Sequence, residues 1–372
     1  MIKVATVDVA FRADASLDIG IGHIMRCLTL AEALREHGVT CHFVCREHPG
    51  HLLDQIRQRG IPVHALPSCK PAERTNDEIG APQPAHTHWL GCDWQTDARQ
   101  TGEILAELQP DWLVVDHYAL DARWERALAS HYRKLMVIDD LADRPHACDL
   151  MLDQTFGREA ADYRPLVPAD CRLLCGSHYA MLRPDFAALR PYSLQRRAAP
   201  ALRELLINMG GIDKDNATGQ VLQALRNCPL PADCRITVVM GATAPWLDAV
   251  RALAQHMPWS TRVRVGVSNM AQLMADSDLA VGAAGATSWE RCCLGLPTVM
   301  MVLAENQRTV ARGLERSGAA KIIDPERLAT LQLGELLVPL STDSAQLLRM
   351  SECAASIVDG SGVNAVMREM GI

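Results

Sequence analysis

Short apolar runs alternate with longer amphipathic stretches along most of the chain. Helices are predicted over residues 24–37 and 51–59, because apolar side chains recur on one face and each stretch ends at a glycine. Strands that alternate with helices at this spacing predict a parallel α/β sheet. The strands predicted in the first half are residues 4–10, 39–45, 61–66, 112–116, 135–139, 149–153 and 172–175.

The same rhythm stops and then restarts in the middle of the chain. Residues 187–202 are polar and basic and contain two prolines, so they are predicted to be a domain boundary. Residues 67–95 also lack a clear period and predict an insertion beside the first domain. We therefore predict two α/β domains, residues 1–190 and 200–350, followed by a helical tail over residues 345–372. The strands predicted in the second domain are residues 204–208, 235–240, 262–265, 279–281 and 298–303.

Composition limits the kind of partner. The formal net charge is −7 and no basic block occurs, which argues against nucleic-acid binding. The 13 cysteines are odd in number and include no CxxC pair, which favours reduced thiols in the cytoplasm. The N-terminus lacks the apolar region of a signal peptide, and no apolar run approaches the ~20 residues that span a bilayer. We expect a cytoplasmic protein without a membrane partner.

The loop after the first strand carries the first candidate site. Gly20 and Gly22 let the backbone approach a ligand, and His23 opens the following helix. The positive end of a helix macrodipole disfavours imidazolium, so His23 is expected to be neutral and able to accept a proton. A plain N-cap role for His23 is the alternative. Arg26 lies on the same helix face and can meet an anion. The loop is not GxGxxG, which disfavours a dinucleotide site.

In the second domain, small-residue loops follow predicted strands. Residues 208–211 and 282–290 offer backbone N–H groups to a phosphate. Glu290 can accept both hydrogens of a ribose diol, although it can also be a simple helix-start residue. Residues 305–307 follow the next strand and face the same rim. The candidate ligand-binding residues here are Asn208, Gly210, Gly211, Gly285, Thr287, Ser288, Glu290, Glu305, Asn306 and Gln307.

Three motifs together resemble a known family. They are the R-x-D-A-S-x-x-I-G-x-G-H-x-x-R of residues 12–26, the YAMLRPDF of residues 179–186 and the TSWERCCLGLP of residues 287–297. They resemble the PseG family of UDP-2,4-diacetamido-2,4,6-trideoxy-β-L-altropyranose hydrolases, within the GT-B nucleotide-sugar superfamily. The likeness covers most of the chain except residues 67–95 and the tail. It implies a GT-B-like α/β fold of two Rossmann-like domains that face each other across a cleft.

The resemblance also implies a reaction. A UDP-linked 2,4-diacetamido-2,4,6-trideoxy sugar of pseudaminic acid biosynthesis, a pathway tied to flagellin glycosylation, would be hydrolysed to free sugar and UDP without a metal or other cofactor. His23 maps to the general base that activates water. UDP is expected on the second domain, with Glu290 at the ribose and Asn208 with the Gly210–Gly211 loop at the diphosphate.

The sugar side is less defined. His117 and Tyr118 follow the strand of residues 112–116 and are candidates to face the sugar, as is Tyr179 of the second motif. Asp14 can either orient His23 or bind the sugar. The aromatic side chain of Trp89 is interpreted as a packing or lid residue.

Other functions remain open at this point. A GT-B glycosyltransferase or a UDP-sugar epimerase would use the same fold, and incubation of a UDP-sugar without an acceptor separates them from a hydrolase. A non-catalytic nucleotide-sugar-binding protein is a third class. Replacement of His23 would leave every measurable activity unchanged in that class.

Overall fold

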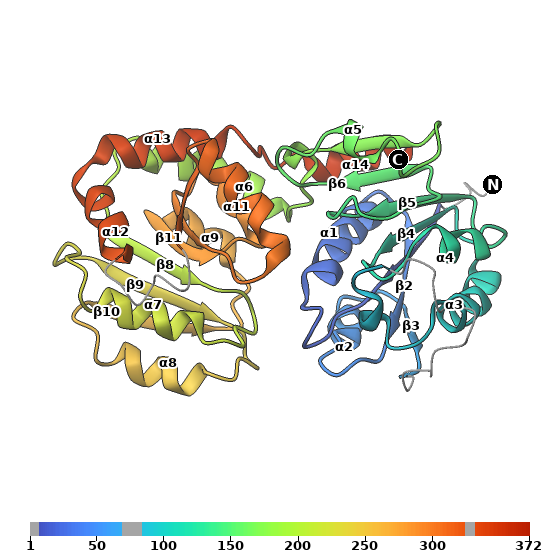
Figure 1. Cartoon of the computed structure of the whole chain (residues 1–372), viewed down its shortest axis with the longest axis horizontal. Helices are drawn as coiled ribbons and strands as arrows, with labels where there is room; N and C mark the ends of the chain where they lie inside the picture. Colours follow the sequence, from blue (N-terminus) through green and yellow to red (C-terminus); the bar gives the residue numbers. More distant parts are fainter. Residues whose placement is uncertain (1–6, 69–83, 324–331) are drawn as a thin grey trace. The chain divides into compact units, whose positions relative to one another are not determined.

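The structure, a computed structural model, describes residues 7–68, 84–323 and 332–372. The chain divides into two compact units (Figure 1). The first unit comprises Met1–Met181 and Val363–Ile372, and the second comprises Leu182–Gly362. Each unit is built around one parallel sheet, as predicted. The prediction that the two domains face each other across a cleft stays a prediction.

The first sheet has the strand order β3-β2-β1-β4-β5-β6-β7. Its central strands are buried on both faces, which is why they read as continuous apolar runs. The order of the strands reverses between β1 and β4, and the carboxyl ends of such a pair form the usual ligand position in open α/β sheets. The strands are β1 (Asp8–Ala13), β2 (Thr40–Arg46), β3 (Val63–Leu66), β4 (Trp112–Asp116), β5 (Lys134–Ile138), β6 (Leu150–Asp153) and β7 (Arg172–Cys175).

The helices of the first unit follow these strands, and most of them connect one strand to the next. They are α1 (Gly22–Glu36), α2 (Leu53–Gln58), α3 (Trp94–Leu108), α4 (Ala122–Ala127), α5 (Ala160–Tyr163) and α14 (Gly362–Met370), with short 3-10 turns η2 (Thr87–Leu90) and η3 (Ser177–Tyr179). The last helix returns from the far end of the chain, and Val363, Val366, Met367 and Met370 join the core of the first unit. The helical tail is therefore divided, because α13 stays with the second unit.

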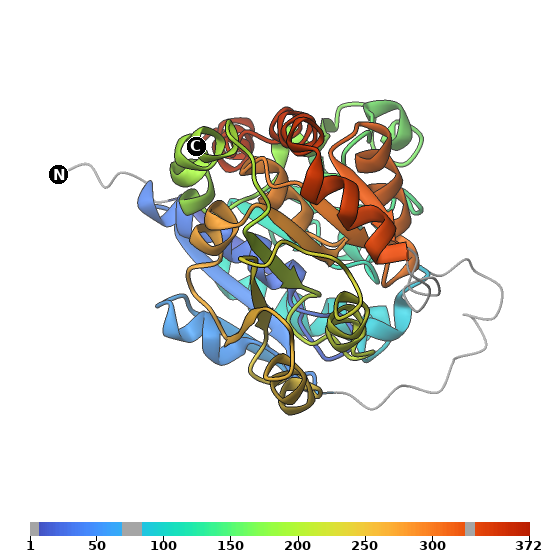
Figure 2. The ribbon, with the colours of Figure 1, turned by 90° about the vertical axis from the view of Figure 1, so that its left-hand side faces the viewer.

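The second sheet has the order β10-β9-β8-β11-β12-β13, and its reversal lies between β8 and β11. Figure 2 views this unit and shows helices around its sheet. Its strands are β8 (Glu204–Asn208), β9 (Arg235–Met240), β10 (Ser260–Val265), β11 (Leu279–Ala283), β12 (Thr298–Met301) and β13 (Ala320–Ile323). Its helices are α6 (Pro184–Arg197), α7 (Ala217–Leu225), α8 (Leu247–Ala254), α9 (Met270–Asp276), α10 (Thr287–Cys293), η4 (Glu305–Gln307), α11 (Arg308–Arg316), α12 (Gln332–Thr342) and α13 (Ser344–Ala355).

Residues 187–202 differ from their predicted role as a linker. Residues 187–197 belong to α6, and the units divide between Met181 and Leu182. The guanidinium of Arg190 donates to the carbonyls of Ala355 at 2.7 Å and of Val358 at 3.0 Å. Arg197, which is buried, donates to carbonyls at the end of α9 in the same way. The basic residues of this predicted boundary therefore hold α6 against other elements of the second unit.

Two further boundaries differ from the prediction. The first strand is β1, Asp8–Ala13, so Arg12 lies in the strand and not in the loop; residues 1–6 lie outside the described residues. Arg12 is fully buried and forms ion pairs with Asp14 and Asp97, each at 2.7 Å. The predicted insertion over residues 67–95 is described only in part, since residues 69–83 lie outside the description. Its end is ordered structure, because η2 is followed by α3 from Trp94.

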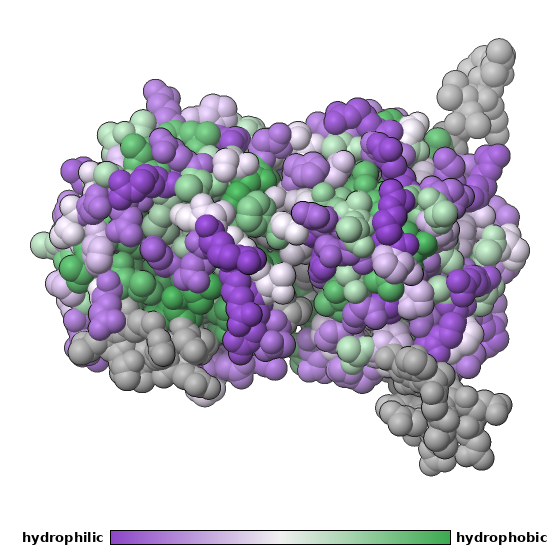
Figure 3. Space-filling view, turned by 45° about the horizontal axis from the view of Figure 1, so that its top comes forward, coloured by the Kyte–Doolittle hydropathy of each residue, from purple (hydrophilic) through white to green (hydrophobic). Residues whose placement is uncertain are grey.

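Figure 3 shows hydrophilic and apolar side chains interspersed on the surface of each unit. A mixed surface of this kind is normal, because more than half of the accessible surface of a folded protein comes from apolar atoms. In the described ranges, no helix combines the length and apolar character needed to cross a membrane.

Candidate functional site

One candidate region lies at the reversal point of the first sheet. His23 is the second residue of α1, which follows β1, and Asp116 is the last residue of the neighbouring strand β4. Their side chains meet, with Nδ1 of His23 2.5 Å from Oδ1 of Asp116. The Asp116 side chain is fully buried, and that of His23 is 9% exposed. The sheet order thus joins two residues that lie 93 positions apart.

Arg26 holds the same carboxylate from one turn further along α1. Its Nε lies 2.6 Å from Oδ2 of Asp116 and its Nη2 lies 2.8 Å from Oδ1. Its third nitrogen, Nη1, donates to Asp140 at 2.6 Å. Burial alone raises the pKa of Asp116, but the charges and hydrogen bonds of Arg26 and His23 together outweigh burial and hold that pKa well below its usual range. Asp116 is therefore an ionised carboxylate and accepts hydrogen bonds on both oxygens.

This arrangement fixes the hydrogen of the imidazole. A carboxylate can only accept, so Nδ1 of His23 carries the hydrogen and donates it to Asp116. In the neutral ring Nε2 then keeps its lone pair and can take a proton. The imidazolium that forms is stabilised by the carboxylate behind it. A His–Asp pair in which the hydrogen is on Nδ1 and the lone pair is on Nε2 is suited to general-base chemistry.

Asp14, the residue considered for orienting His23, has other partners. Its Oδ1 lies 2.7 Å from Nη1 of Arg12 and accepts the backbone N–H of Arg46 at 2.7 Å. The hypothesis that Asp14 orients His23 is therefore wrong, and Asp116 takes that position. The sequence does contain a signal for Asp116: it ends a short apolar run, and such ends lie on the ligand-binding edge of a parallel sheet.

His117 and Tyr118, which follow Asp116, point to different surroundings. Nδ1 of His117 accepts the N–H of Ala119 at 3.1 Å, and its Nε2 lies 3.2 Å from Oδ2 of Asp14. His117 is thus buried and contacts Asp14, and burial lowers the pKa of His117. The ring of Tyr118, in contrast, packs edge-on against His23 with centroids 4.6 Å apart.

The glycines before His23 leave open space. Gly20 has φ +79° and Gly22 begins α1; at both positions an added Cβ would meet nothing within 4 Å. This fits the prediction that the backbone here allows a ligand to approach. Tyr179, at the end of η3, is half-buried and packs against the core of the first unit.

A second candidate region lies at the reversal point of the second sheet. Asn208 ends β8 and donates from Nδ2 to the carbonyl of Val239 at 3.1 Å, so its amide is used to join two strand ends. Gly210 has φ +94° and open space beside it. Gly241 has no room for a side chain, because its Cβ would lie 2.1 Å from the carbonyl oxygen of Gly211. The two loops therefore pack backbone on backbone.

The loop after β11 is supported from beneath by Arg291. This guanidinium is buried and donates to the carbonyl of Ala283 at 2.7 Å and to the hydroxyls of Ser288 at 3.1 Å and Thr287 at 3.3 Å. Burial lowers the pKa of Arg291 to about 10. The Ser288 side chain is itself fully buried, so it supports the loop from inside.

Glu290 lies in the first turn of α10 and is half-buried. Burial raises its pKa to about 7, although the charge of Arg183 opposes this rise. Gln307 lies beside the loop, since an added Cβ at Gly285 would be 3.8 Å from its Nε2. Glu305 is exposed and pairs with Arg308 at 2.6 Å. The side chain of Asn306 lies outside the described residues.

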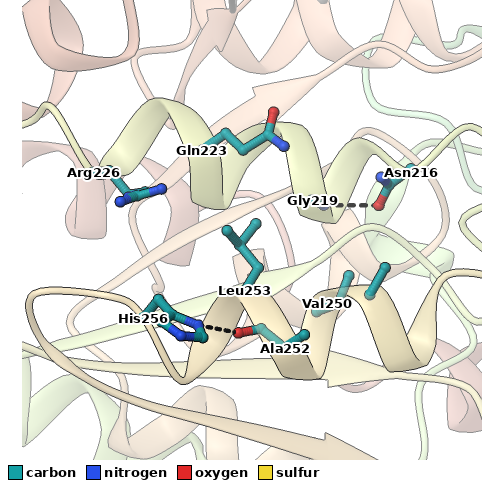
Figure 4. A pocket seen from close by; sticks show the side chains of 9 residues that line it. Asn216, Gly219, Gln223, Arg226, Val250, Ala252, Leu253 and His256 are labelled. Atoms are coloured by element: carbon teal, nitrogen blue, oxygen red, sulfur yellow. Dashed lines mark hydrogen bonds between the residues drawn. The ribbon is translucent and has the colours of Figure 1, made fainter.

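A separate groove lies between α7 and α8 on the second unit (Figure 4). Asn216 caps α7 by accepting the N–H of Gly219, and Nδ1 of His256 lies 2.8 Å from the carbonyl of Ala252. These polar groups serve their own helices. The groove is lined by helix faces and not by the loops after the strands, so it is not part of the candidate site.

Metal chemistry was expected to be absent. Within the part of the chain that the structure describes, no group of three His, Cys, Asp or Glu side chains could hold a metal ion. His86 and His88 lie with ring centroids 6.4 Å apart. Independence from metals stays a prediction for the reaction itself.

Comparison with protein families and curated proteins finds similar proteins. Residues 252–363 match the glycosyltransferase family 28 C-terminal domain. The chain is 26% identical over 311 residues to the UDP-2,4-diacetamido-2,4,6-trideoxy-beta-L-altropyranose hydrolase of Campylobacter jejuni, and the match covers 83% of this chain and 97% of that one.

Solved structures agree on the fold. MurG of Acinetobacter baumannii matches with a TM-score of 0.70 at 16% identity, covering 98% of this chain and 99% of that one. The UDP-GlcNAc 2-epimerase of Neisseria meningitidis, solved with UDP-GlcNAc bound, matches with a TM-score of 0.58 at 13% identity, covering 98% and 99%. The comparisons therefore confirm the resemblance that the sequence motifs indicate: this chain has the GT-B fold and is related to the PseG family of nucleotide-sugar hydrolases.

Proposed function

We propose that this protein hydrolyses a UDP-linked sugar to UDP and the free sugar, with His23 as the general base. The observation that carries the proposal is the 2.5 Å contact between His23 and Asp116. It leaves Nε2 of the ring as the proton acceptor, in a position with only slight exposure to solvent. The similarity to the Campylobacter hydrolase supports water as the acceptor and a 2,4-diacetamido-2,4,6-trideoxy sugar as the substrate.

In the proposed reaction, Nε2 of His23 takes a proton from a water molecule as the water oxygen bonds to the anomeric carbon. The bond between that carbon and the diphosphate oxygen breaks, and UDP leaves with the electron pair. UDP is a good leaving group, so the main requirements are a placed water and a stabilised diphosphate. Proton transfer of this kind contributes about 10²–10⁴-fold to a rate.

The second unit is proposed to bind UDP. Glu290 would accept the two ribose hydroxyls, and the loops at Gly210–Gly211 and Gly282–Ser288 would surround the diphosphate. The open space beside Gly210 and the support of the second loop by Arg291 favour this assignment. A role in pseudaminic acid biosynthesis and flagellin glycosylation, a cytoplasmic location and the absence of a metal requirement belong to the same proposal.

The test is incubation of UDP-2,4-diacetamido-2,4,6-trideoxy-β-L-altropyranose with the protein alone, followed by NMR. UDP and free sugar are expected, with and without EDTA. His23→Asn should lower kcat by about 10² or more, because the asparagine amide is polar but cannot act as the base. Calorimetry should show unchanged UDP binding. A His23→Asn protein with wild-type kcat would reject the proposed base.

A glycosyltransferase is the second candidate, favoured by the match of residues 252–363 to a glycosyltransferase domain. His23 would then take the proton of an acceptor hydroxyl in place of water. The two activities separate in the same NMR experiment. UDP that is released only when an acceptor is added indicates a transferase, and conversion to a different UDP-sugar indicates an epimerase.

A further inference from the structure

Aromatic rings from residues 86–89 lie beside the proposed base. The ring of Trp89 stacks on Tyr118 with centroids 5.8 Å apart and an interplanar angle of 24°. His86 packs against Trp89 at 4.3 Å and against Tyr118 at 5.6 Å. His23 touches the same group, 4.6 Å from Tyr118 and 6.3 Å from Trp89. We call Trp89, His86 and Tyr118 the aromatic wall.

The wall is fixed at both of its ends. Tyr118 donates its hydroxyl to Asp140 at 2.6 Å, and Asp140 also accepts from Arg26. On the other side Leu90 is fully buried in the core of the first unit. Gly91 follows with φ +75°, and an added Cβ there would lie 2.8 Å from Cε1 of His48. The backbone at Gly91 therefore packs closely against the His48 side chain. The rings therefore form a preformed surface.

The wall is uncharged and still partly open. Trp89 and His86 are both half-buried, so part of each ring remains available for contact. Burial and the neighbouring His88 lower the pKa of His86, which keeps its imidazole neutral at pH 7. Neutral aromatic rings favour ligands with an apolar face.

We propose that Trp89 and His86, together with Tyr118, form a binding subsite for the apolar C–H and methyl face of the sugar portion of the substrate. This rests on the proposed function, because it takes a UDP-sugar as the ligand. The reacting carbon belongs to the sugar, so the base His23 must lie next to the sugar-binding surface, and the aromatic wall is in direct contact with His23. It makes a deoxy sugar the preferred substrate class.

Selectivity follows from the chemistry of the wall. Burial of a methyl group against aromatic carbon is favourable, whereas burial of a hydroxyl without a partner is unfavourable. A sugar with CH₃ at C6 should therefore bind better than the same sugar with CH₂OH. The expected preference is about fourfold or more, the value of one buried methyl.

The experiment measures binding by calorimetry in the His23→Asn background, which prevents turnover. The probes are UDP, UDP-N-acetylglucosamine and the 6-deoxy counterpart of UDP-N-acetylglucosamine. Trp89→Ala should raise the Kd of the 6-deoxy UDP-sugar about tenfold and abolish the preference for CH₃, with the Kd of UDP unchanged. Trp89→Phe should restore most of the affinity, and His86→Ala should show a smaller loss in the same direction.

Trp246→Ala is the matched control, because Trp246 is an exposed tryptophan of the second unit whose Nε1 donates to the carbonyl of Lys214. It should leave all three Kd values unchanged. An unchanged Kd for the 6-deoxy UDP-sugar in both Trp89→Ala and His86→Ala overturns the subsite, as does an equal loss for UDP. A wild-type protein that binds the UDP-sugars through the wall but does not hydrolyse them overturns only the proposed reaction.

Discussion

Oδ1 of Asp116 lies 2.5 Å from Nδ1 of His23, and both carboxylate oxygens of Asp116 accept hydrogen bonds from Arg26. The carboxylate is completely buried, and the fixed positive charge of Arg26 keeps it ionised. Because the acceptor is fixed, the ring has one tautomer, with Nε2 unprotonated. Asp116 therefore fixes both the orientation of the imidazole ring and the nitrogen that can accept a proton.

Asp116→Asn tests this positioning role. The amide of asparagine can donate to Nδ1, which would place the hydrogen on Nε2 and leave no proton acceptor. We expect kcat to fall by about 10²–10⁴-fold and the pH profile of the rate to change, with the Kd of UDP unchanged. Asp248→Asn, at an exposed carboxylate of the second unit, is the control. Wild-type kcat and an unaltered pH profile in Asp116→Asn would remove Asp116 from the mechanism.

Most strands could be predicted from the sequence. Four predicted strands, residues 112–116, 172–175, 204–208 and 235–240, have the bounds that the structure gives to β4, β7, β8 and β9. These runs are apolar because parallel strands are covered by helices on both faces. The loops that follow them could be assigned to the ligand-binding edge for the same reason.

The partner of His23 could not be predicted, because it depends on which strand lies next to β1. Strand order comes from long-range packing, and the pattern along the chain gives only the ends of each strand. The contact of Trp89 with Tyr118 could not be predicted for a similar reason, since its segment has no period and the contact arises only in the folded chain. The contacts of the basic residues of α6 could not be predicted, because their partners are carbonyl groups of helices that lie far away in the sequence.

Glu290→Gln should change the pH dependence of stability. The pKa of Glu290 is about 7 in the folded protein, above the value of about 4.3 expected for the unfolded chain. Between these two pKa values, Glu290 is protonated in the folded state and ionised in the unfolded chain. The contribution of the protonated carboxyl to the free energy of unfolding is therefore full below pH ~4.3 and is lost as the pH rises through ~7. Glu290→Gln should remove this loss and gain about 2–3 kcal/mol over wild type at pH 8. Urea unfolding at pH 5 and pH 8 measures the difference.

The same variant reports on UDP. If the carboxylate of Glu290 accepts two ribose hydroxyls, its replacement by an amide should weaken UDP binding by about 1–3 kcal/mol. Calorimetry at pH 8, where Glu290 is ionised, gives the largest contrast with wild type. Stability that responds to pH as in wild type, or equal UDP affinity in the two proteins, would contradict the corresponding part of this assignment.

Met367→Ala should destabilise the first unit. Met367 lies on α14, is 4% exposed and packs in the core of that unit although it comes from the end of the chain. Removal of a buried methionine side chain costs about 2–5 kcal/mol. Arg368→Ala, at the adjacent exposed position of α14, should change stability by less than about 0.5 kcal/mol. Thermal unfolding measures both, and equal unfolding temperatures for the two variants would show that α14 contributes little to the core.

Arg291→Met tests the charge beneath the loop of residues 282–288, which is proposed to bind the diphosphate. Arg291 is 1% exposed, and among the residues with described positions no carboxylate forms an ion pair with it. Its guanidinium donates instead to Ala283, Thr287 and Ser288, so its positive charge lies directly under the loop. A buried cation without an acid is costly to the apoprotein, and a bound diphosphate would supply the missing negative charge. We expect Arg291→Met to raise the Kd of UDP by about tenfold or more and to leave the Kd of uridine nearly unchanged.

Arg291→Lys is the companion variant for this test. Lysine keeps the positive charge but lacks the planar guanidinium that donates to three acceptors. Arg291→Lys should therefore disturb the conformation of the loop and keep the charge beneath it. If charge is the main contribution, Arg291→Lys retains most of the difference between UDP and uridine, and this difference weakens with added salt. If geometry is the main contribution, both variants bind uridine less well too. Equal losses for UDP and uridine in Arg291→Met would show that Arg291 only holds the loop together and that its charge does not reach the ligand.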